Sequence, residues 1–322
     1  MSAPYQRGTA LLSVLLMTVV MGVLVLSMLD DVRFGLRRSG NAESVAQAQR
    51  FALGAEALAR RRVMQLLRDD VGTTEWSGKP LLFPIENGLL RATLRDGTAC
   101  FNLNSVVEGS ANHWQANAMG VRQYLALLDA LDFSTAQAQG LADTLVDWID
   151  TDTRRSPLGA EDSTYLALRP AYRSAGTLLA ETSELRAIHG YDATVYARLR
   201  PHVCTLPVAS LSPVNVNALD LEQAPLLTML TLGAMRPDAA RQVLTARPAR
   251  GWPDVATFAS LPAIQQANVD DAVLSQIELH STWFVLEADV EYAGAQVTLN
   301  ALLQQDGTRP ARLRARRWTH EE

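Results

Sequence analysis

Apolar residues are most concentrated in one uncharged run close to the N-terminus. Residues 9–29 read TALLSVLLMTVVMGVLVLSML, 21 positions without a charged side chain. A helix of that length rises about 31 Å at 1.5 Å per residue, which matches the ~30 Å hydrocarbon layer of a bilayer. The run is longer than the apolar part of a cleaved secretory signal, and Asp30 follows it directly. We therefore predict a membrane-spanning helix, with a signal peptide removed whole as the alternative.

Helical character continues beyond this run. No proline occurs between Asp30 and Leu67, and alanine, glutamine, glutamate and arginine dominate the segment. Phe51, Leu58 and Val63 are apolar positions on one partly buried stripe of such a helix. The span and the stalk are therefore predicted to form a single helix of about 60 residues, close to 90 Å long.

Basic residues flank the span unequally. Arg7 precedes it, whereas Arg33, Arg37 and Arg38 follow it. The positive-inside rule alone would place the C-terminal side in the cytoplasm, since acidic residues such as Asp30 count weakly. The charge pattern therefore argues for a cytoplasmic soluble part.

Apolar and polar residues alternate in two separate regions of the soluble part. Residues 88–104 (GLLRATLRDGTACFNLN) predict a hairpin turning at Asp96-Gly97, and residues 281–318 predict three strands divided by Ala293-Gly294 and Asp306-Gly307. About 175 residues of helical character lie between them, including a candidate helix at 136–148. Strands, helices and again strands predict an α+β fold with a helical domain inserted into a small antiparallel sheet.

Composition narrows the class of protein. The 322 residues are 48% hydrophobic and 20% charged, as in folded proteins, and the net charge of −5 argues against broad nucleic-acid binding. The two cysteines, Cys100 and Cys204, lack CxxC spacing and a histidine partner, so a zinc site is not expected. They could form one disulfide in an oxidising compartment or remain two buried thiols.

Residues 146–165 (VDWIDTDTRRSPLGAEDSTY) are the most acidic stretch of the chain. Calcium takes six to eight oxygen ligands from carboxylates and carbonyls on irregular loops. Asp150-x-Asp152 starts such a loop, Gly159 permits its return, and Glu161-Asp162 closes it, although the spacing is not that of an EF-hand. A solvated loop with helix caps is the alternative, and a catalytic carboxylate pair is disfavoured because no hydrolase motif is present.

Two further acidic residues, Asp143 and Asp147, precede the loop on a predicted helix and are weaker ligand candidates. Glu184 could approach the site from outside the loop. Neither possibility follows from spacing alone.

Residues 214–262 resemble a helix-hairpin-helix unit of the type found in DNA receptors. DNA-binding versions carry a Gly-apolar-Gly hairpin whose N–H groups meet phosphate. This hairpin, LGAMRPD, has a single glycine and places Asp238 where negative charge is unwelcome. We therefore expect a packing unit, and a membrane-anchored DNA receptor remains the main alternative function.

The N-terminus resembles that of type IV pilin-like proteins, in which a basic residue and a glycine precede a continuous apolar helix. In that family a prepilin peptidase cuts after the glycine, here Gly8, and Thr9 becomes the methylated first residue. Most members have glutamate at mature position five, whereas this chain has Ser13. That departure is characteristic of the K minor pseudopilins of type II secretion systems, which the chain resembles over essentially its whole length.

The resemblance implies a particular architecture. A leader (1–8) and a transmembrane and stalk helix (9–70) would precede a pilin-like sheet in two parts (71–104 and 279–322). A large all-α domain of SAM-like or helix-hairpin-helix-like fold (105–278) would be inserted between them and would bind calcium as a structural ion. By resemblance to the stretch DWID-D…P…GAED…Y, the carried-over ligands are Asp150, Asp152, Glu161 and Asp162.

The resemblance also implies a function and its partners. The protein would be a non-enzymatic subunit at the tip of the pseudopilus, anchored once in the bacterial inner membrane with its soluble part in the periplasm. It would assemble with the I and J minor pseudopilins, then with H and the major pseudopilin, after processing by the prepilin peptidase, and would not bind nucleic acid. A membrane-anchored hydrolase is a further rival, distinguishable by loss of activity when Glu161 or Asp162 is neutralised.

Overall fold

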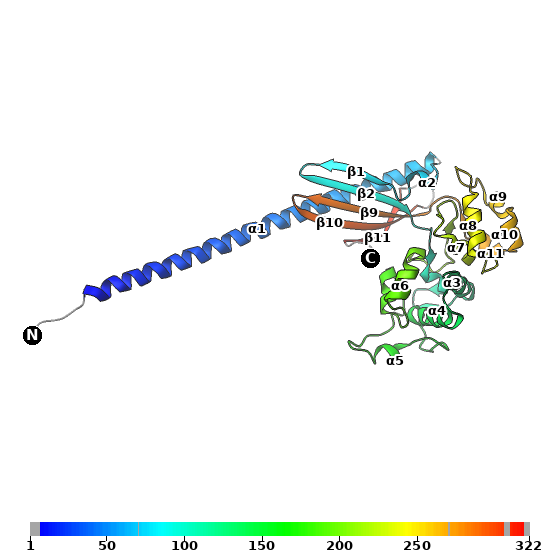
Figure 1. Ribbon diagram of the computed structural model, residues 1–322, viewed down its shortest axis with the longest axis horizontal. Coiled ribbons are helices and arrows are strands. Elements are labelled where there is room, and N and C mark those ends of the chain that lie inside the picture. The colour runs from blue at the N-terminus through cyan, green and yellow to red at the C-terminus, as the bar shows by residue number, and fades with distance from the viewer. Residues whose placement is uncertain (1–6, 70, 270, 306–309, 319–322) are drawn as a thin grey trace, which may run out of the picture.

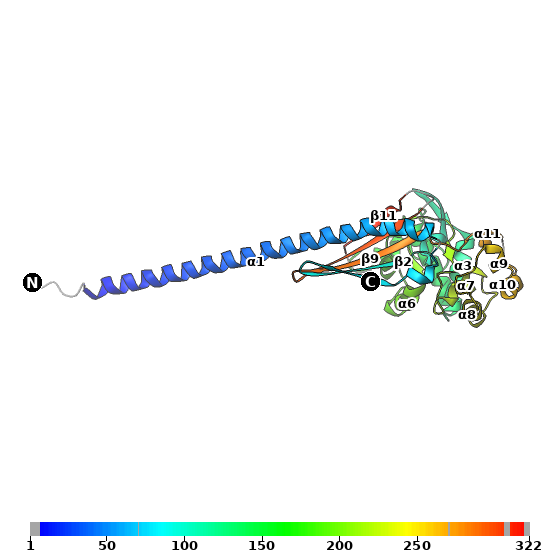
Figure 2. The same ribbon diagram turned by 90° about the horizontal axis from the view of Figure 1, so that it is seen from above.

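The computed structural model describes residues 7–69, 71–269, 271–305 and 310–318, with side chains described from residue 11 onward. The first six residues of the expected leader therefore lie outside the described residues. Helix α1 (Arg7–Arg68) is 62 residues long, so the predicted union of span and stalk in one helix is confirmed. It extends far beyond the rest of the molecule (Figures 1 and 2). Among the described residues, α1 alone is long and apolar enough to cross a membrane.

Five antiparallel strands form the sheet on which the second half of α1 packs. Their spatial order is β1-β2-β9-β10-β11. The strands are β1 (Pro80–Ile85), β2 (Gly88–Asp96), β9 (Trp283–Tyr292), β10 (Ala295–Gln304) and β11 (Arg312–Arg317), and α2 (Thr73–Trp76) leads from α1 into β1. The central pairing joins Ala92 of β2 to Ala288 of β9, so the sheet is completed only after the intervening insert has been passed.

Alanines allow α1 to lie close against this sheet. Ala48, Ala52, Ala55 and Ala59 recur every three or four residues, share one helix face and are buried. They contact the apolar face of β9 and β10. On one flank of α1, Glu56 accepts two hydrogen bonds from the Arg316 guanidinium of β11, at 2.6 and 2.9 Å.

The two strand regions had different outcomes. The three C-terminal runs are confirmed as strands where the chain is described, and Ala293-Gly294 makes the expected turn with positive φ at both residues. The Asp306-Gly307 turn lies outside the described residues. The predicted hairpin turning at Asp96-Gly97 is wrong. The hairpin turns instead between Ile85 and Gly88, because PLLFPI forms the edge strand β1, whose two prolines disguised it.

The helical insert joins β2 to β9 and lies at the end of the sheet remote from the N-terminus (Figure 1). Its first half contains α3 (Ala118–Ala130), α4 (Thr135–Ile149), α5 (Asp162–Tyr165) and α6 (Ala193–Leu199), the 3₁₀ helices η1 (Leu103–Val106), η2 (Thr182–Ala187) and η3 (Arg200–His202), and the hairpin β4 (Val107–Ser110) with β5 (His113–Ala116). Its second half contains α7 (Ala224–Leu230), α8 (Pro237–Thr245), α9 (Val255–Ala259), α10 (Pro262–Gln266) and α11 (Asp271–Leu274).

Each half of the insert is closed at its base by a short parallel strand pair. β3 (Phe101–Asn102) pairs with β6 (Val203–Cys204), and β7 (Val214–Asn215) pairs with β8 (Ile277–Glu278). The two halves share one hydrophobic core, in which Tyr124 and Leu128 of α3 are fully buried. The insert is thus one packed unit built on two strand-closed segments.

A disulfide joins Cys100, which follows the end of β2, to Cys204 of β6. The two Cα atoms are 5.7 Å apart and the bond closes a sequence separation of 104 residues. It therefore sits beside the β3–β6 pair and locks the first half of the insert at the point where the chain leaves the sheet.

Candidate metal centre

The acidic loop is positioned by the two helices that border it. Ser134 caps the N-terminus of α4 by accepting a hydrogen bond from the Gln137 amide, and Asp150 occupies the C-cap position of α4. Glu161 then occupies the N-cap position of α5. The loop between these two caps, residues 150–161, folds back on itself and brings the two ends together.

Three carboxylates converge in this loop. Oxygens of Asp150, Asp152 and Glu161 all lie within 4.8 Å of one another. Asp150 and Glu161 are buried, whereas Asp152 is exposed. Within the described part of the chain, Asp150 Oδ1 and Glu161 Oε1 are buried without a hydrogen-bond partner. A buried carboxylate oxygen without a donor is costly, and a bound cation would remove that cost.

The electrostatics of the loop also disfavour three ionised carboxylates without a counter-charge. Burial first, and then the negative charges of its neighbours, Asp152 foremost, together raise the pKa of the Asp150 carboxyl to about 7. Burial also raises the pKa of Glu161, followed by repulsion from Asp147. Like charges held this close disfavour each other's ionised form, and a cation between them would reverse that penalty.

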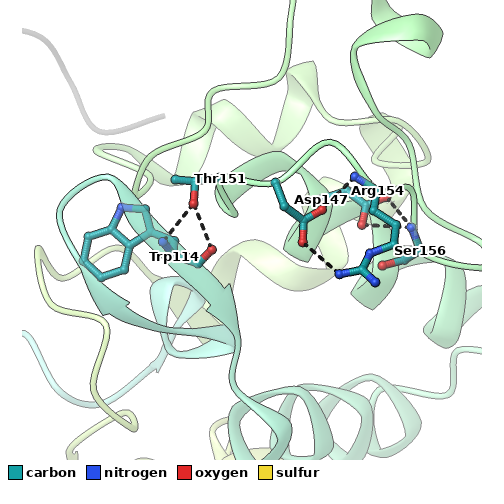
Figure 3. A network of polar contacts seen from close by, with 6 residues as sticks. Trp114, Asp147, Thr151, Arg154 and Ser156 are labelled. Carbon is teal, nitrogen blue, oxygen red and sulfur yellow. Dashed lines mark hydrogen bonds and ion pairs between the residues drawn. The ribbon is translucent and has the colours of Figure 1, made fainter.

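Two helix carboxylates hold the loop backbone. Asp147 accepts from the Ser156 amide at 3.1 and 3.2 Å, a contact visible in Figure 3. Asp143 accepts from the Leu158 amide at 3.0 Å. A Cβ atom on Gly159 would stand 2.0 Å from Asp147 Oδ2, so glycine is needed for this close approach. The sequence-based view of Asp143 and Asp147 as weaker candidates is consistent with these contacts.

The other end of the loop is tied to the β4–β5 hairpin. The Thr151 hydroxyl lies at 3.2 Å from the Trp114 amide and donates to the Trp114 carbonyl at 3.3 Å (Figure 3). Asp152 accepts from the Arg154 amide at 2.7 Å. These contacts hold the segment that carries Asp152 against the body of the insert.

Asp162 and Glu184 are not brought to the cluster. Asp162 accepts from Arg173 at 2.7 Å and from the Ser174 amide and hydroxyl at 3.1 Å, which directs its carboxylate toward the following loop. Glu184 accepts from the amides of Ala180 and Glu181 and so caps η2. The structure thus gathers three of the four proposed ligands. Adjacent residues in the sequence, Glu161 and Asp162, diverge because the first precedes α5 and the second begins it.

The donor set suits a hard divalent cation. Calcium prefers carboxylate and carbonyl oxygens in irregular loops and tolerates an exposed side open to water. Two buried oxygens that lack donors and one exposed carboxylate are compatible with such an ion. Asp150, Asp152 and Glu161 are therefore the residues that would hold it.

Charged side chains of the helix-hairpin-helix region are paired within the region itself. Leu232 and Gly233, both with positive φ, form the turn between α7 and α8. Asp238 pairs with Arg241 at 3.1 Å on α8. The guanidinium of Arg247 donates to the carbonyls of Val216 and Leu219. These contacts favour the packing role that the sequence predicted.

A long apolar helix lying on a small antiparallel sheet, with a helical insert between the second and third strands of that sheet, defines a pilin-like protein of the minor pseudopilin class. Sequence models of "Type II secretion system (T2SS), protein K" match residues 99–208 and 214–280, which are the two strand-closed halves of the insert. This chain belongs to the type II secretion system protein K family.

Individual relatives agree with the family match. Type II secretion system protein K of Aeromonas hydrophila is 39% identical over 257 residues, covering 77% of each chain. The protein of the same name from Klebsiella pneumoniae is 35% identical over 308 residues, covering 94% of this chain and 93% of its own. A solved chain of the GspK-GspI-GspJ complex from enterotoxigenic Escherichia coli has a TM-score of 0.76 and 32% identity, and the match covers 88% of this chain and 99% of that one.

Proposed function

We propose that this chain is the minor pseudopilin at the tip of the type II secretion pseudopilus, where it initiates or caps assembly together with the I and J components. The observation that carries the proposal is the likeness to a solved chain crystallised in a GspK-GspI-GspJ complex, at 32% identity over 88% of this chain. The H component and the major pseudopilin would join below these three subunits.

The shape of the molecule supports a terminal position in the filament. The insert lies at the end of the sheet remote from the apolar part of α1 (Figure 1). A subunit added beyond it would meet the insert before it could lay its own helix beside α1. Ser13 has no charge with which to pair an N-terminus ahead of it, so this subunit needs no predecessor.

The apolar part of α1 supports anchoring in the inner membrane. Residues Leu11 to Leu29 include large apolar side chains that are at least 48% exposed, and a bilayer or neighbouring helices would cover them. Cleavage after Gly8 and methylation of Thr9 by the prepilin peptidase remain predictions from the resemblance. The periplasmic position of the sheet and insert is part of the same proposal.

The acidic loop would hold a structural calcium ion. Bound there, the ion would supply positive charge to Asp150, Asp152 and Glu161, and its role would be to keep the loop folded. Asp143 and Asp147 would not need to bind the ion, because they hold the loop backbone by accepting hydrogen bonds from the amides of Leu158 and Ser156. No catalytic task is assigned to these carboxylates.

Secretion by a strain that lacks this chain tests the function. We expect export of the strain's own type II cargo to fall at least about ten-fold and to return when the full-length chain is supplied. Recovery of the I and J components with the tagged chain from detergent-solubilised membranes should accompany it. Normal export without the chain would contradict the proposal, and DNA retained by the purified chain with a steep salt dependence would favour the DNA-receptor alternative.

A further inference from the structure

A cavity of about 360 Å³ lies where the helical insert meets the sheet. In its floor, Leu302 of β10 pairs with Val285 of β9 and with Ala315 of β11. The neighbouring residues Leu286 and Ala301 are buried in the core that α1 forms with the sheet. Because successive side chains of a strand point to opposite faces, the floor belongs to the sheet face away from α1. The cavity thus has an apolar floor that α1 does not cover.

Two loop segments of the insert, residues 179–181 and 204–207, form the wall of the cavity. The buried side-chain amide of Asn104 donates to the carbonyls of Leu179 and Leu206, at 2.9 Å each, and so joins the two segments. The disulfide described above anchors the second segment at its first residue. A wall that is already held in place loses little conformational entropy when a ligand binds, so the cavity is preformed.

Three arginines line the cavity, and two of them are already paired. Arg316 bonds to Glu56 of α1 at 2.6 Å. Arg317 bonds to Glu181 at 2.8 Å and thereby links β11 to the loop wall. A ligand would have to displace a carboxylate of the protein to use the charge of either guanidinium.

Arg314 supplies the third and uncompensated charge. Its side chain is exposed, and its guanidinium lies 5.9 Å from the centre of the ring of Trp283, a distance typical of a cation–π contact. Among the described residues, no carboxylate lies within ion-pair distance of this guanidinium. The contact with the ring uses the face of the guanidinium, so its N–H groups can still bind a carboxylate in their own plane. The cavity therefore combines an apolar floor with one cation that can bind an anion.

We propose that this cavity binds an extended segment of a partner protein in which an apolar residue adjoins a glutamate or an aspartate. The apolar side chain would lie on Val285 and Leu302, and the carboxylate would bind the Arg314 guanidinium. A cavity of 360 Å³ is near the lower end of the ~300–1,000 Å³ range of ligand sites, so it admits a few side chains but not a folded surface.

The position of the cavity determines where its partner comes from. The floor faces away from α1, so subunits that assemble through their long helices leave it accessible. The inference therefore goes beyond the proposed function, which concerns only the subunits of the pseudopilus. It assigns the chain a second kind of partner, recognised through an acidic and apolar segment.

Binding of two fluorescein-labelled peptides to the full-length chain in detergent tests the role of charge. The probes are Gly-Ser-Leu-Glu-Leu-Ser-Gly-amide and the same peptide with lysine in place of glutamate, and empty micelles provide the background. We expect fluorescence anisotropy to show that the wild-type chain binds the glutamate peptide at least about five-fold more tightly than the lysine peptide. Arg314→Glu should reverse this preference. Equal affinities for the two peptides, or an unchanged preference in Arg314→Glu, would refute the inference.

Arg91→Glu is the matched control for this charge change. Arg91 is also exposed, and it lies between Leu90 and Ala92, which pack toward α1, so it projects from the same sheet face as Arg314. It lines a separate depression beside Asp289. Arg91→Glu should keep the preference for the glutamate peptide within about two-fold of wild type. A reversal equal to that of Arg314→Glu would trace the effect to the overall charge of the sheet face and contradict the site.

The apolar floor is tested by filling it. Ala315→Phe places a ring over the floor and should weaken binding of the glutamate peptide at least about five-fold. If Ala315→Phe lowers the protease resistance of the chain, a glutamate peptide with serine in place of both leucines provides the same test on the wild-type chain and should bind at least about five-fold more weakly. Unchanged affinity in these tests would exclude the apolar contact. Displacement of the glutamate peptide by an equal concentration of sodium hexanoate would assign the cavity to small acids and overturn the inference.

Discussion

Calcium binding at the acidic loop should raise the thermal stability of the insert, and Asp150→Asn should abolish that increase. The wild-type loop buries two carboxylate oxygens that have no donor within the described residues, Asp150 Oδ1 and Glu161 Oε1. Each such oxygen costs about 1–3 kcal/mol, so an ion that satisfies both could recover about 2–6 kcal/mol. Replacing Asp150 with asparagine removes one ligand charge and one source of repulsion.

The size of the expected shift follows from binding linkage. Free calcium at a hundred times its dissociation constant stabilises the native state by about 2.7 kcal/mol, which lies within the range set by the two oxygens. For a folded unit of 150–250 residues, about 1 kcal/mol moves the melting temperature by roughly 2–4 °C. Saturating calcium should therefore raise the melting temperature of the wild-type chain by about 5–11 °C. Asp150→Asn without calcium should be at least as stable as the calcium-free wild type.

Tryptophan fluorescence of the full-length chain in detergent is a suitable assay. Trp148 lies two residues before Asp150, and its ring is 5.0 Å from that of Tyr165 and 6.2 Å from that of Tyr172, so loosening of the loop should alter its emission. Asp162→Asn is the matched control, because Asp162 binds Arg173 and Ser174 and its variant should keep the calcium shift. The reasoning would be refuted if adding calcium to the chelator-treated wild-type chain left its melting temperature unchanged. It would also be refuted if calcium raised the melting temperature of the Asp150→Asn variant as much as that of the wild type.

Three further predictions address the frame around the loop. The double replacement Cys100→Ser, Cys204→Ser should lower the free energy of unfolding by about 2–5 kcal/mol, since the disulfide closes a separation of 104 residues, and denaturant titration under non-reducing conditions measures it. Glu56→Gln should destabilise the contact of α1 with β11 by about 1–3 kcal/mol because it replaces a paired, buried carboxylate, and an unchanged denaturation midpoint would contradict this. Burial raises the pKa of Glu278 to about 6, above its ordinary 4.5, so its contribution to stability is present below pH 4.5 and is lost as the pH rises through 6. Glu278→Gln should therefore match the wild type at pH 4 and exceed it at pH 7.5 by up to about 2 kcal/mol before solvent screening, and a difference independent of pH would exclude that cause.

Elements with a strong local pattern agree with the sequence predictions. The apolar run and the proline-free stalk form α1, and the segment predicted as a helix at 136–148 is α4, observed at Thr135–Ile149. The alternation in residues 283–304 forms β9 and β10. These patterns depend on residues only a few positions apart, so a single stretch of chain contains the information.

The edge strand shows where local patterns mislead. PLLFPI has two prolines and no polar alternation, because both of its faces are open and its outward backbone needs no donor. Its apolar residues therefore have no period that sequence analysis can detect. The turn was predicted at Asp96-Gly97 instead, because Asp-Gly is a common pair in hairpin turns. In the structure Asp96 is half-buried and receives hydrogen bonds from Asn215 and from the Thr98 amide, where the sheet meets the insert.

At the candidate site, the sequence identifies the acidic loop but not which of its carboxylates come together. Composition marks residues 146–165 as acidic, and spacing alone treats Glu161 and Asp162 as equivalent. The start of α5 between them turns Glu161 toward Asp150 and Asp162 toward Arg173. Which carboxylates meet is thus decided by the direction of one short helix.

The sequence by itself determined the long helix, the C-terminal strands, the helical character of the insert and the place of the acidic loop, because each depends on the pattern of residues only a few positions apart. The tertiary structure alone decided that Ala92 pairs with Ala288, that Cys100 meets Cys204, and that Asp150, Asp152 and Glu161 converge while Asp162 does not. Such partners are far apart in the chain, and their meeting depends on the packing of the whole domain, which no local period records.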